Sequence, residues 1–219
     1  MLQTPIAADV LYPDSDGEAM ADNTIQYRWI VRLVTNLKRL LTDQTAFVAG
    51  DLLWYPIQVK VPPVPVQAPD VMVVLGRPDG DLPIATLRER GSYKQWEEDK
   101  IAPQVVFEIL SPSNSAREML AKQAFYREHG VLEMFFYDPD SYDFWGLVRK
   151  NLDEDFSPLT PINFPWVSPT LKIRFELFDD GLVIFHPDGE LFKDPGEFIK
   201  ERDRAFAKLR ELGIDPEQL

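Results

Sequence analysis

The sequence contains no cysteine, and histidine is scarce, with two in 219 residues. The lack of cysteine excludes disulfide bonds and thiolate metal sites, and it fits a reducing cytoplasm, where we expect the protein to reside. The histidines, His129 and His186, are separated by 57 positions, and neither has a metal-ligating neighbour at the usual spacing. A zinc site or a catalytic triad built on histidine is therefore disfavoured.

Long apolar runs and nucleotide-binding motifs are also missing. No stretch approaches the roughly 20 apolar residues that a membrane span requires, and the opening segment MLQTPIAADV lacks the basic and apolar regions of a signal peptide. Neither a Walker loop nor a dinucleotide fingerprint occurs. We therefore expect a cytoplasmic protein with no membrane contact and no nucleotide-driven chemistry.

Basic residues are outnumbered, because 23 lysines and arginines face 36 aspartates and glutamates, giving a formal net charge of -13 and a sequence pI near 4.6. This balance opposes the basic surface typical of nucleic-acid binders. It does not exclude nucleic acid, since the local field in a cleft decides binding and bound cations offset catalytic acids. The polar segment 76–102 is either a solvated loop whose aromatics pack against the sheet, or a functional or dimer contact in which basic residues bind a phosphate backbone and Tyr93 and Trp96 stack on a base. Dimerisation would group four of the basic residues along one groove. The groove would contain Arg88, Arg90, Lys94 and Lys100.

The chain is long enough for one sizeable core, and 45% of its residues are apolar. We predict an extended arm over residues 1–22, one domain over 23–190 and a helical tail over 191–219. Apolar spacing and capping signals predict three helices and several strands. The helices are expected near 24–41, 116–130 and 195–213, and the strands within 45–61, 67–76, 104–110, 132–137, 142–149 and 175–185. The segment 45–61 is expected to form two short strands, the second alternating over 57–61. This order predicts an α/β (α+β) fold, in which a mixed central sheet is flanked by helices, with extra antiparallel hairpins and a C-terminal helix.

One acid lies inside an apolar strand. Residues 104–110 are apolar or β-branched apart from the leading glutamine and Glu108. An ionised group that is buried without a partner is costly, so Glu108 should face a cation, a hydrogen-bond network or a water-filled cleft. The alternative is a frayed strand end at which Glu108 pairs with an arginine.

The helix after this strand carries a lysine. Ser115 and Glu118 have the spacing of a capping box, and Lys122 lies on the flank of the helix, where it is able to reach over the sheet. The alternative is an ordinary surface lysine whose stem lies along the helix. The predicted packing stripe of this helix consists of Ala116, Met119, Leu120 and Ala124.

A second apolar strand, within 67–76, opens with Pro69 and Asp70. Two acids on two buried strands, Asp70 and Glu108, indicate a metal site, because Mg and Mn prefer carboxylate oxygens. Such an ion keeps several waters, and Lys122 is placed to orient or help deprotonate one of them. Three other acids are better explained as turn or surface residues, namely Asp51, Glu133 and Asp138.

The order of Asp70, then Glu108-Ile109-Leu110, then Lys122 resembles the PD-(D/E)xK nuclease superfamily. The segments PDVMVV, VVFEILSPS, KQAFY and GVLEMFFYDP resemble more closely the Uma-two family, a cyanobacterial-type domain of unknown function classed as putative restriction endonucleases. In the superfamily the lysine usually stands two residues after the second acid, where this chain has Leu110. The family supplies the lysine from the following helix, which is the place of Lys122.

The resemblance covers roughly residues 24–190 and implies a restriction-endonuclease-like, metal-dependent endonuclease that hydrolyses DNA. By this resemblance, Asp70 and Glu108 hold Mg (or Mn), the Ile109 carbonyl completes the shell, and Lys122 orients the attacking water. The helix before the sheet sometimes adds a polar group in the superfamily, and the candidates here are Gln26 and Asn36. We also expect a homodimer, since cutting both strands of a duplex requires two sites.

A competing hypothesis starts from the acidic composition. The same fold would then be a non-catalytic interaction module that binds a protein partner through its acidic surface and its C-terminal helix. The net charge of -13 favours this module, whereas the joint presence of Asp70, Glu108 and Lys122 favours the enzyme. The C-terminal helix carries a narrow apolar stripe of Phe198, Phe206 and Leu209.

Overall fold

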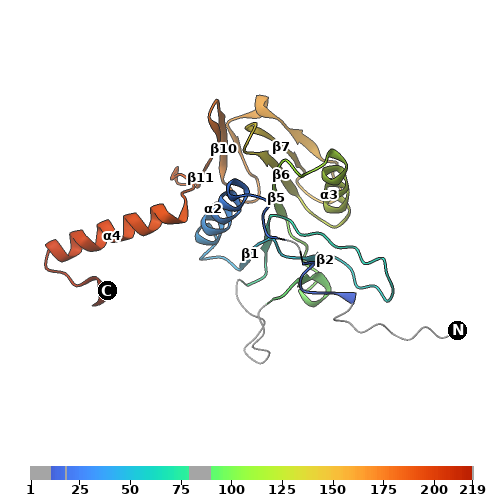
Figure 1. The fold of residues 1–219 in the computed structure, drawn as a ribbon, viewed down its shortest axis with the longest axis horizontal. Coiled ribbons are helices and arrows are strands. Elements are labelled where there is room, and N and C mark those ends of the chain that lie inside the picture. The colour runs from blue at the N-terminus through green and yellow to red at the C-terminus, as the bar shows by residue number, and fades with distance from the viewer. Residues whose placement is uncertain (1–10, 18, 79–89, 219) are drawn as a thin grey trace.

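The computed structural model describes residues 11–17, 19–78 and 90–218. Its centre is a six-stranded sheet in the order β1-β3-β5-β6-β7-β8 (Figure 1). The strands are β1 (Ala46–Gly50), β3 (Val71–Leu75), β5 (Val105–Ile109), β6 (Glu133–Asp138), β7 (Asp143–Val148) and β8 (Ser157–Leu159). Neighbours are antiparallel except β5 and β6, which are parallel and are connected through helix α3 (Ala116–Glu128). The predicted mixed sheet flanked by helices is confirmed.

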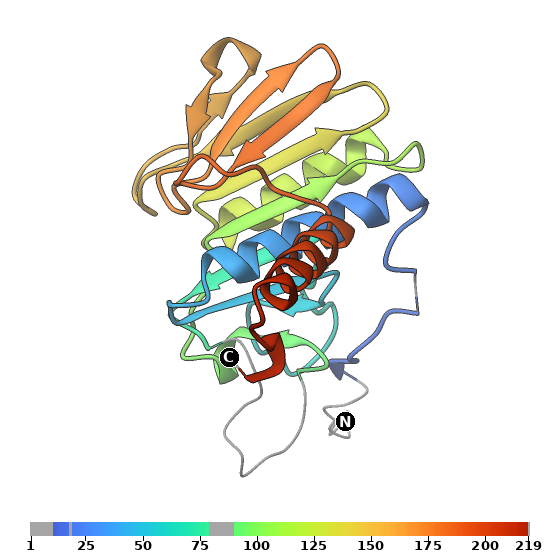
Figure 2. The ribbon, with the colours of Figure 1, turned by 90° about the vertical axis from the view of Figure 1, so that its left-hand side faces the viewer.

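Helices α2 (Thr24–Leu40) and α3 cover opposite faces of this sheet (Figures 1 and 2). Helix α2 begins after the N-cap Asn23, whose side chain accepts hydrogen bonds from two backbone N–H groups of the first turn. Helix α3 begins after Ser115, which forms the predicted capping box with Glu118. The predicted starts of both helices are therefore confirmed.

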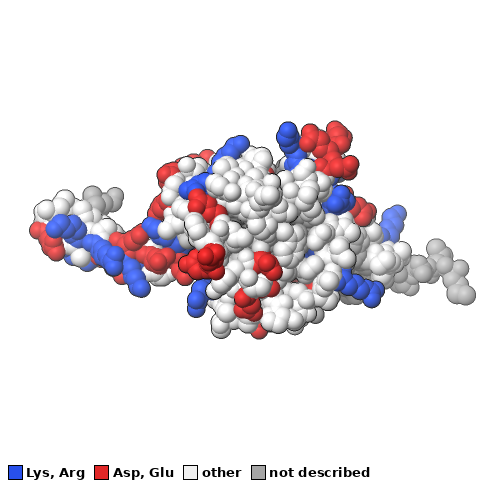
Figure 3. Space-filling model, turned by 90° about the horizontal axis from the view of Figure 1, so that it is seen from above, with Lys and Arg blue, Asp and Glu red and all other residues white. Residues whose placement is uncertain are grey.

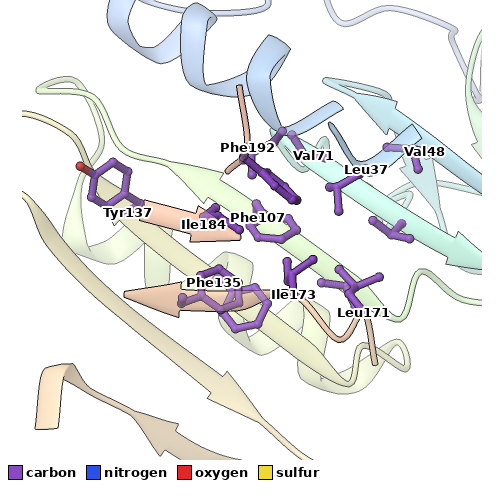
Figure 4. Close-up of a cluster of buried hydrophobic side chains, with 14 of the residues drawn as sticks. Leu37, Val48, Val71, Phe107, Phe135, Tyr137, Leu171, Ile173, Ile184 and Phe192 are labelled. Atoms are coloured by element: carbon purple, nitrogen blue, oxygen red, sulfur yellow. The ribbon is translucent and has the colours of Figure 1, made fainter. Parts of the chain in front are cut away.

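Strand β5 divides its side chains between the two sides of the sheet. Val105, Phe107 and Ile109 pack in the core under α2, part of which is shown in Figure 4, and Val106 packs in the core under α3. Successive side chains of a strand point to opposite faces. Glu108 is two positions after Val106, so its side chain points to the same face of the sheet, toward α3.

In the part of the chain that the structure describes, two smaller sheets and three short 3₁₀ helices accompany the central sheet. Strands β9 (Trp166–Val167), β10 (Arg174–Phe178) and β11 (Gly181–Phe185) form one sheet, and β2 (Trp54–Tyr55) pairs in parallel with β4 (Tyr93–Lys94). The predicted hairpin within 175–185 is confirmed as β10–β11. The 3₁₀ helices are η1 (Gln95–Glu97), η2 (Pro161–Asn163) and η3 (Pro216–Gln218).

The alternating strand predicted over 57–61 is wrong, because these residues have no regular secondary structure. The strand in this part of the chain is the shorter β2, in which Trp54 and Tyr55 are buried, whereas Ile57 and Val61 remain about half exposed at 49% and 51%. Prolines stand on both sides of the segment and lack the N–H group that a sheet ladder requires. Alternation alone therefore does not make this segment a strand.

Helix α3 buries a different face from the predicted one. Its buried residues are Met119 and Tyr126, whereas Leu120, expected in the packing stripe, is 65% exposed. Lys122 and Tyr126 are one turn apart, and both reach Glu108 in the sheet. The orientation of α3 about its own axis is thus set by its contacts with Glu108 in β5 as well as by its apolar residues.

Both ends of the described chain lie outside the central sheet. Leu11 and Tyr12 of the arm are buried in a small cluster with Leu53 and Tyr55. Helix α4 (Pro195–Glu211) has the predicted capping box, projects from the body in Figure 1, and contains no buried residue. The division into arm, domain and tail stays a prediction. Within the ranges that the structure describes, no helix has the length and apolarity to cross a membrane.

Candidate active site

Three residues that are far apart in the sequence meet on the α3 side of strand β5. Asp70 directly precedes β3, Glu108 lies in β5, and Lys122 lies in α3. The antiparallel register pairs Val71 with Phe107, which sets Asp70 opposite Glu108. The Nζ atom of Lys122 donates a hydrogen bond to Oε2 of Glu108 at 2.7 Å. The three residues selected from the sequence are thus brought together.

Two donors from one helix hold the carboxylate of Glu108, which is 2% exposed. Lys122 bonds to Oε2, and the hydroxyl group of Tyr126 donates to Oε1. Burial raises the pKa of Glu108, while the charge and hydrogen bond of Lys122 and the hydrogen bond of Tyr126 oppose this rise. Both plainer alternatives are therefore wrong: Lys122 is not an ordinary surface lysine, and Glu108 does not pair with an arginine at a frayed strand end.

Asp70 is also buried, with 9% of its surface exposed. Its Oδ2 atom accepts a hydrogen bond from the backbone N–H of Ile109 at 2.6 Å. Burial, and next the charge of Glu108, raise the pKa of Asp70 to about 8, against the opposing effects of Lys122, the Ile109 N–H and Gln26. In the absence of a further cation, the carboxyl group of Asp70 is mostly protonated at neutral pH.

Gln26 connects helix α2 to the same end of strand β5. Its Nε2 atom donates to the carbonyl oxygen of Ile109 at 2.9 Å, and its Oε1 atom accepts from the backbone N–H of Asp22 at 2.8 Å. Of the two polar candidates on α2, Gln26 therefore lies at the site. Asn36 does not, because its amide group donates instead to backbone carbonyls of α2 and of the segment before α4.

A cleft of about 220 Å³ opens beside these residues. Its walls come from the N-terminal arm, the turn after β1, the start of β3 and helix α3. Among the described residues that line the cleft, Lys122 is the only basic one. The acids along it are Asp16, Asp22, Asp51, Asp70 and Glu118. Such a wall attracts cations and repels phosphates.

Two other acids named from the sequence have structural contacts. Glu133 was expected at the surface but is 1% exposed, so that expectation is wrong. Its carboxylate accepts hydrogen bonds from the hydroxyl group of Ser168 and from the backbone N–H of Thr170, which connects β6 to the segment before β10. Asp138 accepts a hydrogen bond from the backbone N–H of Asp140 at 2.9 Å, as expected for a turn residue.

Two of the four basic residues proposed for the groove have acidic partners. Arg90 forms an ion pair with Glu98 at 2.7 Å, and Nζ of Lys94 lies 3.7 Å from a carboxylate oxygen of Asp14. Arg88 lies outside the described residues. On the face seen in Figure 3, basic and acidic side chains are interspersed around a largely uncharged centre. These contacts give no support to the groove.

Tyr126 is the site residue that the sequence analysis missed. It is fully buried, its hydroxyl group bonds to Glu108, and its ring lies nearly parallel to that of Trp54, with the centroids 6.3 Å apart. The available signal was its spacing, since a residue four positions after Lys122 lies on the same side of the helix. The predicted packing stripe oriented the helix by its apolar residues, so the spacing of Lys122 and Tyr126 did not assign the tyrosine to the site.

The chain is similar to the solved structure described as "a putative nuclease belonging to DUF820" from Anabaena variabilis ATCC 29413, with 16% identity, 66% of this chain and 73% of that chain covered, and a TM-score of 0.41. No curated protein matches the chain. The model of the Uma2 family, described as "Putative restriction endonuclease", matches residues 5–161, well over half of the 219 residues. The chain therefore belongs to the Uma2 family.

Proposed function

We propose that this protein is a metal-dependent endonuclease that hydrolyses DNA phosphodiester bonds. The observation that carries the proposal is the meeting of Asp70, Glu108 and Lys122, from three separate elements, at one cleft: Asp70 and Lys122 line it, and Glu108 lies behind Lys122. Membership of the Uma2 family supports the nuclease class. The metal, the residue roles and the substrate are our inference from the chemistry of this cleft.

The oxygen atoms at the site fit a hard divalent cation. Among the residues that the structure describes, no group of three or more histidine, cysteine, aspartate or glutamate side chains lies close enough together to form a metal cage. Asp70 and Glu108 nevertheless offer two buried carboxylates, and the carbonyl of Ile109, the residue after Glu108, adds a third oxygen, which accepts a hydrogen bond from Gln26. Mg and Mn are commonly bound by one or two carboxylates, with waters completing the shell. A cation would also relieve the repulsion between the two acids.

The proposed mechanism assigns one task to each residue. Asp70, Glu108 and the Ile109 carbonyl hold the ion. When bound, the ion lowers the pKa of its water and offsets charge on the phosphate. Lys122 orients the attacking water and stabilises the charge that develops on the phosphate in the transition state.

The second candidate is a non-catalytic interaction module of the same fold. The observations that favour it are the net charge of -13 and the projecting helix α4, on which Ile199 is 52% exposed and after which the C-cap residue Leu212 is 66% exposed. A protein partner would cover these side chains. The predicted homodimer and the cytoplasmic location accompany either candidate as proposals.

The test is a nicking assay on supercoiled plasmid with Mg or Mn, repeated on RNA. We expect the wild type to nick DNA only when the metal is present, and we expect Asp70→Asn, Glu108→Gln and Lys122→Met to be inactive. Glu133→Gln is the matched control, because it also neutralises a buried acid but lies outside the cleft. Full activity of Asp70→Asn would refute the assigned site. Absence of cleavage by the wild type on both substrates would favour the interaction module.

A further inference from the structure

The two donors to Glu108 differ in how firmly the structure holds them. Tyr126 is 0% exposed, and its ring has two aromatic neighbours. Trp54 is nearly parallel to it at 7°, and Phe125 meets it edge-on at 83°. A tyrosine side chain has only two rotatable bonds before its hydroxyl group. The hydroxyl group of Tyr126 is therefore fixed against Oε1 of Glu108.

Lys122 is held less firmly. Its side chain is 14% exposed, lines the cleft, and reaches Oε2 of Glu108 through a flexible four-carbon stem. A cation entering the cleft competes with the ammonium group for this oxygen, because both carry positive charge. Lys122 is able to turn toward the cleft without disturbing the packed core, whereas Tyr126 is not.

We infer that Tyr126 is a positioning residue that fixes the orientation of the Glu108 carboxylate, so that Lys122 is free to release Oε2 to a divalent ion. The inference rests on the proposed metal site. It assigns opposite effects to two donors on one carboxylate: the tyrosine strengthens metal binding, and the lysine competes with it. Groups that orient metal ligands typically change metal affinity by about 10- to 100-fold when they are mutated.

The test measures Mn and Mg binding by calorimetry, without any assay of cleavage. We expect Tyr126→Phe to weaken metal binding by about 10-fold or more, and Lys122→Met to bind the metal at least as tightly as the wild type. Wild-type affinity in Tyr126→Phe would overturn the inference while leaving the metal site intact. Weaker binding in Lys122→Met would overturn the competition between the lysine and the ion. No binding by the wild type would overturn both the inference and the proposed function.

The chain offers a closely matched control in Tyr93. This residue is also 0% exposed, donates one hydrogen bond to the Ile101 carbonyl at 2.8 Å, and stacks on Phe47 with the ring centroids 5.9 Å apart. It does not line the cleft. Tyr93→Phe should lose stability comparable to that lost by Tyr126→Phe and keep wild-type metal affinity. Equal losses of affinity in the two variants would show a general effect of a missing buried hydroxyl group and would overturn the inference.

A measurement on the wild type keeps the inference testable if Tyr126→Phe does not fold. Addition of Mg should shift the ¹⁵N resonance of the Lys122 ammonium group, because the lysine leaves Glu108. The ¹³Cζ resonance of Tyr126 should stay in place, because its hydrogen bond persists. A large Tyr126 shift with an unchanged Lys122 signal would contradict the inference.

Discussion

Replacing Asp70 with Asn should stabilise the metal-free protein at neutral pH. Asp70 is buried, and burial followed by the charge of Glu108 raises its pKa from 3.8 to about 8. At pH 7 the unfolded chain has an ionised Asp70 and the folded chain a protonated one, which costs folding about 1.4 kcal/mol for each pH unit above 3.8, or about 4 kcal/mol. Asparagine is neutral in both states and keeps an oxygen for the Ile109 N–H.

The sign of the pH dependence follows from the raised pKa. The contribution of Asp70 to stability is complete below about pH 3.8 and is lost as the pH rises toward about 8. Urea unfolding of the wild type and Asp70→Asn in a chelator should therefore show a gap that widens from pH 4 to pH 8, with little change in the slope against urea. A constant gap, or a variant less stable than the wild type at pH 7, would refute the reasoning.

Asp22→Asn is the matched control for this experiment. Asp22 lines the same cleft, but hydrogen bonds from the hydroxyl groups of Ser111 and Ser113 lower its pKa. The carboxylate of Asp22 is therefore stabilised in the folded state, and its replacement should destabilise the protein above about pH 4. Addition of a metal ion should then raise the free energy of unfolding of the wild type but not that of Asp70→Asn. At a metal concentration of 100 times the dissociation constant, binding adds about 2.7 kcal/mol to the stability of the wild type.

The remaining predictions concern residues outside the cleft. Glu190→Gln should lose less than about 1 kcal/mol of stability at pH 7. The stability difference from the wild type should shrink as the pH falls from 4.5 to about 2, because the hydrogen bond from Arg39 lowers the pKa of Glu190 to about 2. Urea unfolding at pH 7 and pH 3 measures this change. Glu133→Ala should lose about 3 kcal/mol on urea unfolding, since it leaves one buried and one partly buried donor without an acceptor, and calorimetry should show unchanged metal affinity. Leu120→Lys should change the unfolding free energy by less than about 0.5 kcal/mol, whereas Met119→Ala should cost about 2 kcal/mol or more; equal effects would contradict the observed face of α3.

Local signals in the sequence were sufficient for the elements that carry the site. The capping box at Ser115 depends on residues three positions apart, and the buried strand around Glu108 depends on a continuous apolar run, so neither requires knowledge of the partner element. The rotation of α3 was not predictable in this way. It depends on the contact of Tyr126 with Glu108, which only the fold brings together. The burial of Glu133 likewise depends on Ser168, 35 residues later in the chain.

The acidic composition gives the metal a second role in the proposed reaction. Five acids line the cleft beside a single described lysine, Lys122, and Glu108 adds a sixth acid behind it. Phosphate oxygens approaching this wall meet a negative field, which disfavours DNA before any chemistry begins. A divalent ion held by Asp70 and Glu108 would make the field beside the cleft less negative. In this protein the ion would therefore govern substrate binding as well as hydrolysis, and the two donors to Glu108 would control both.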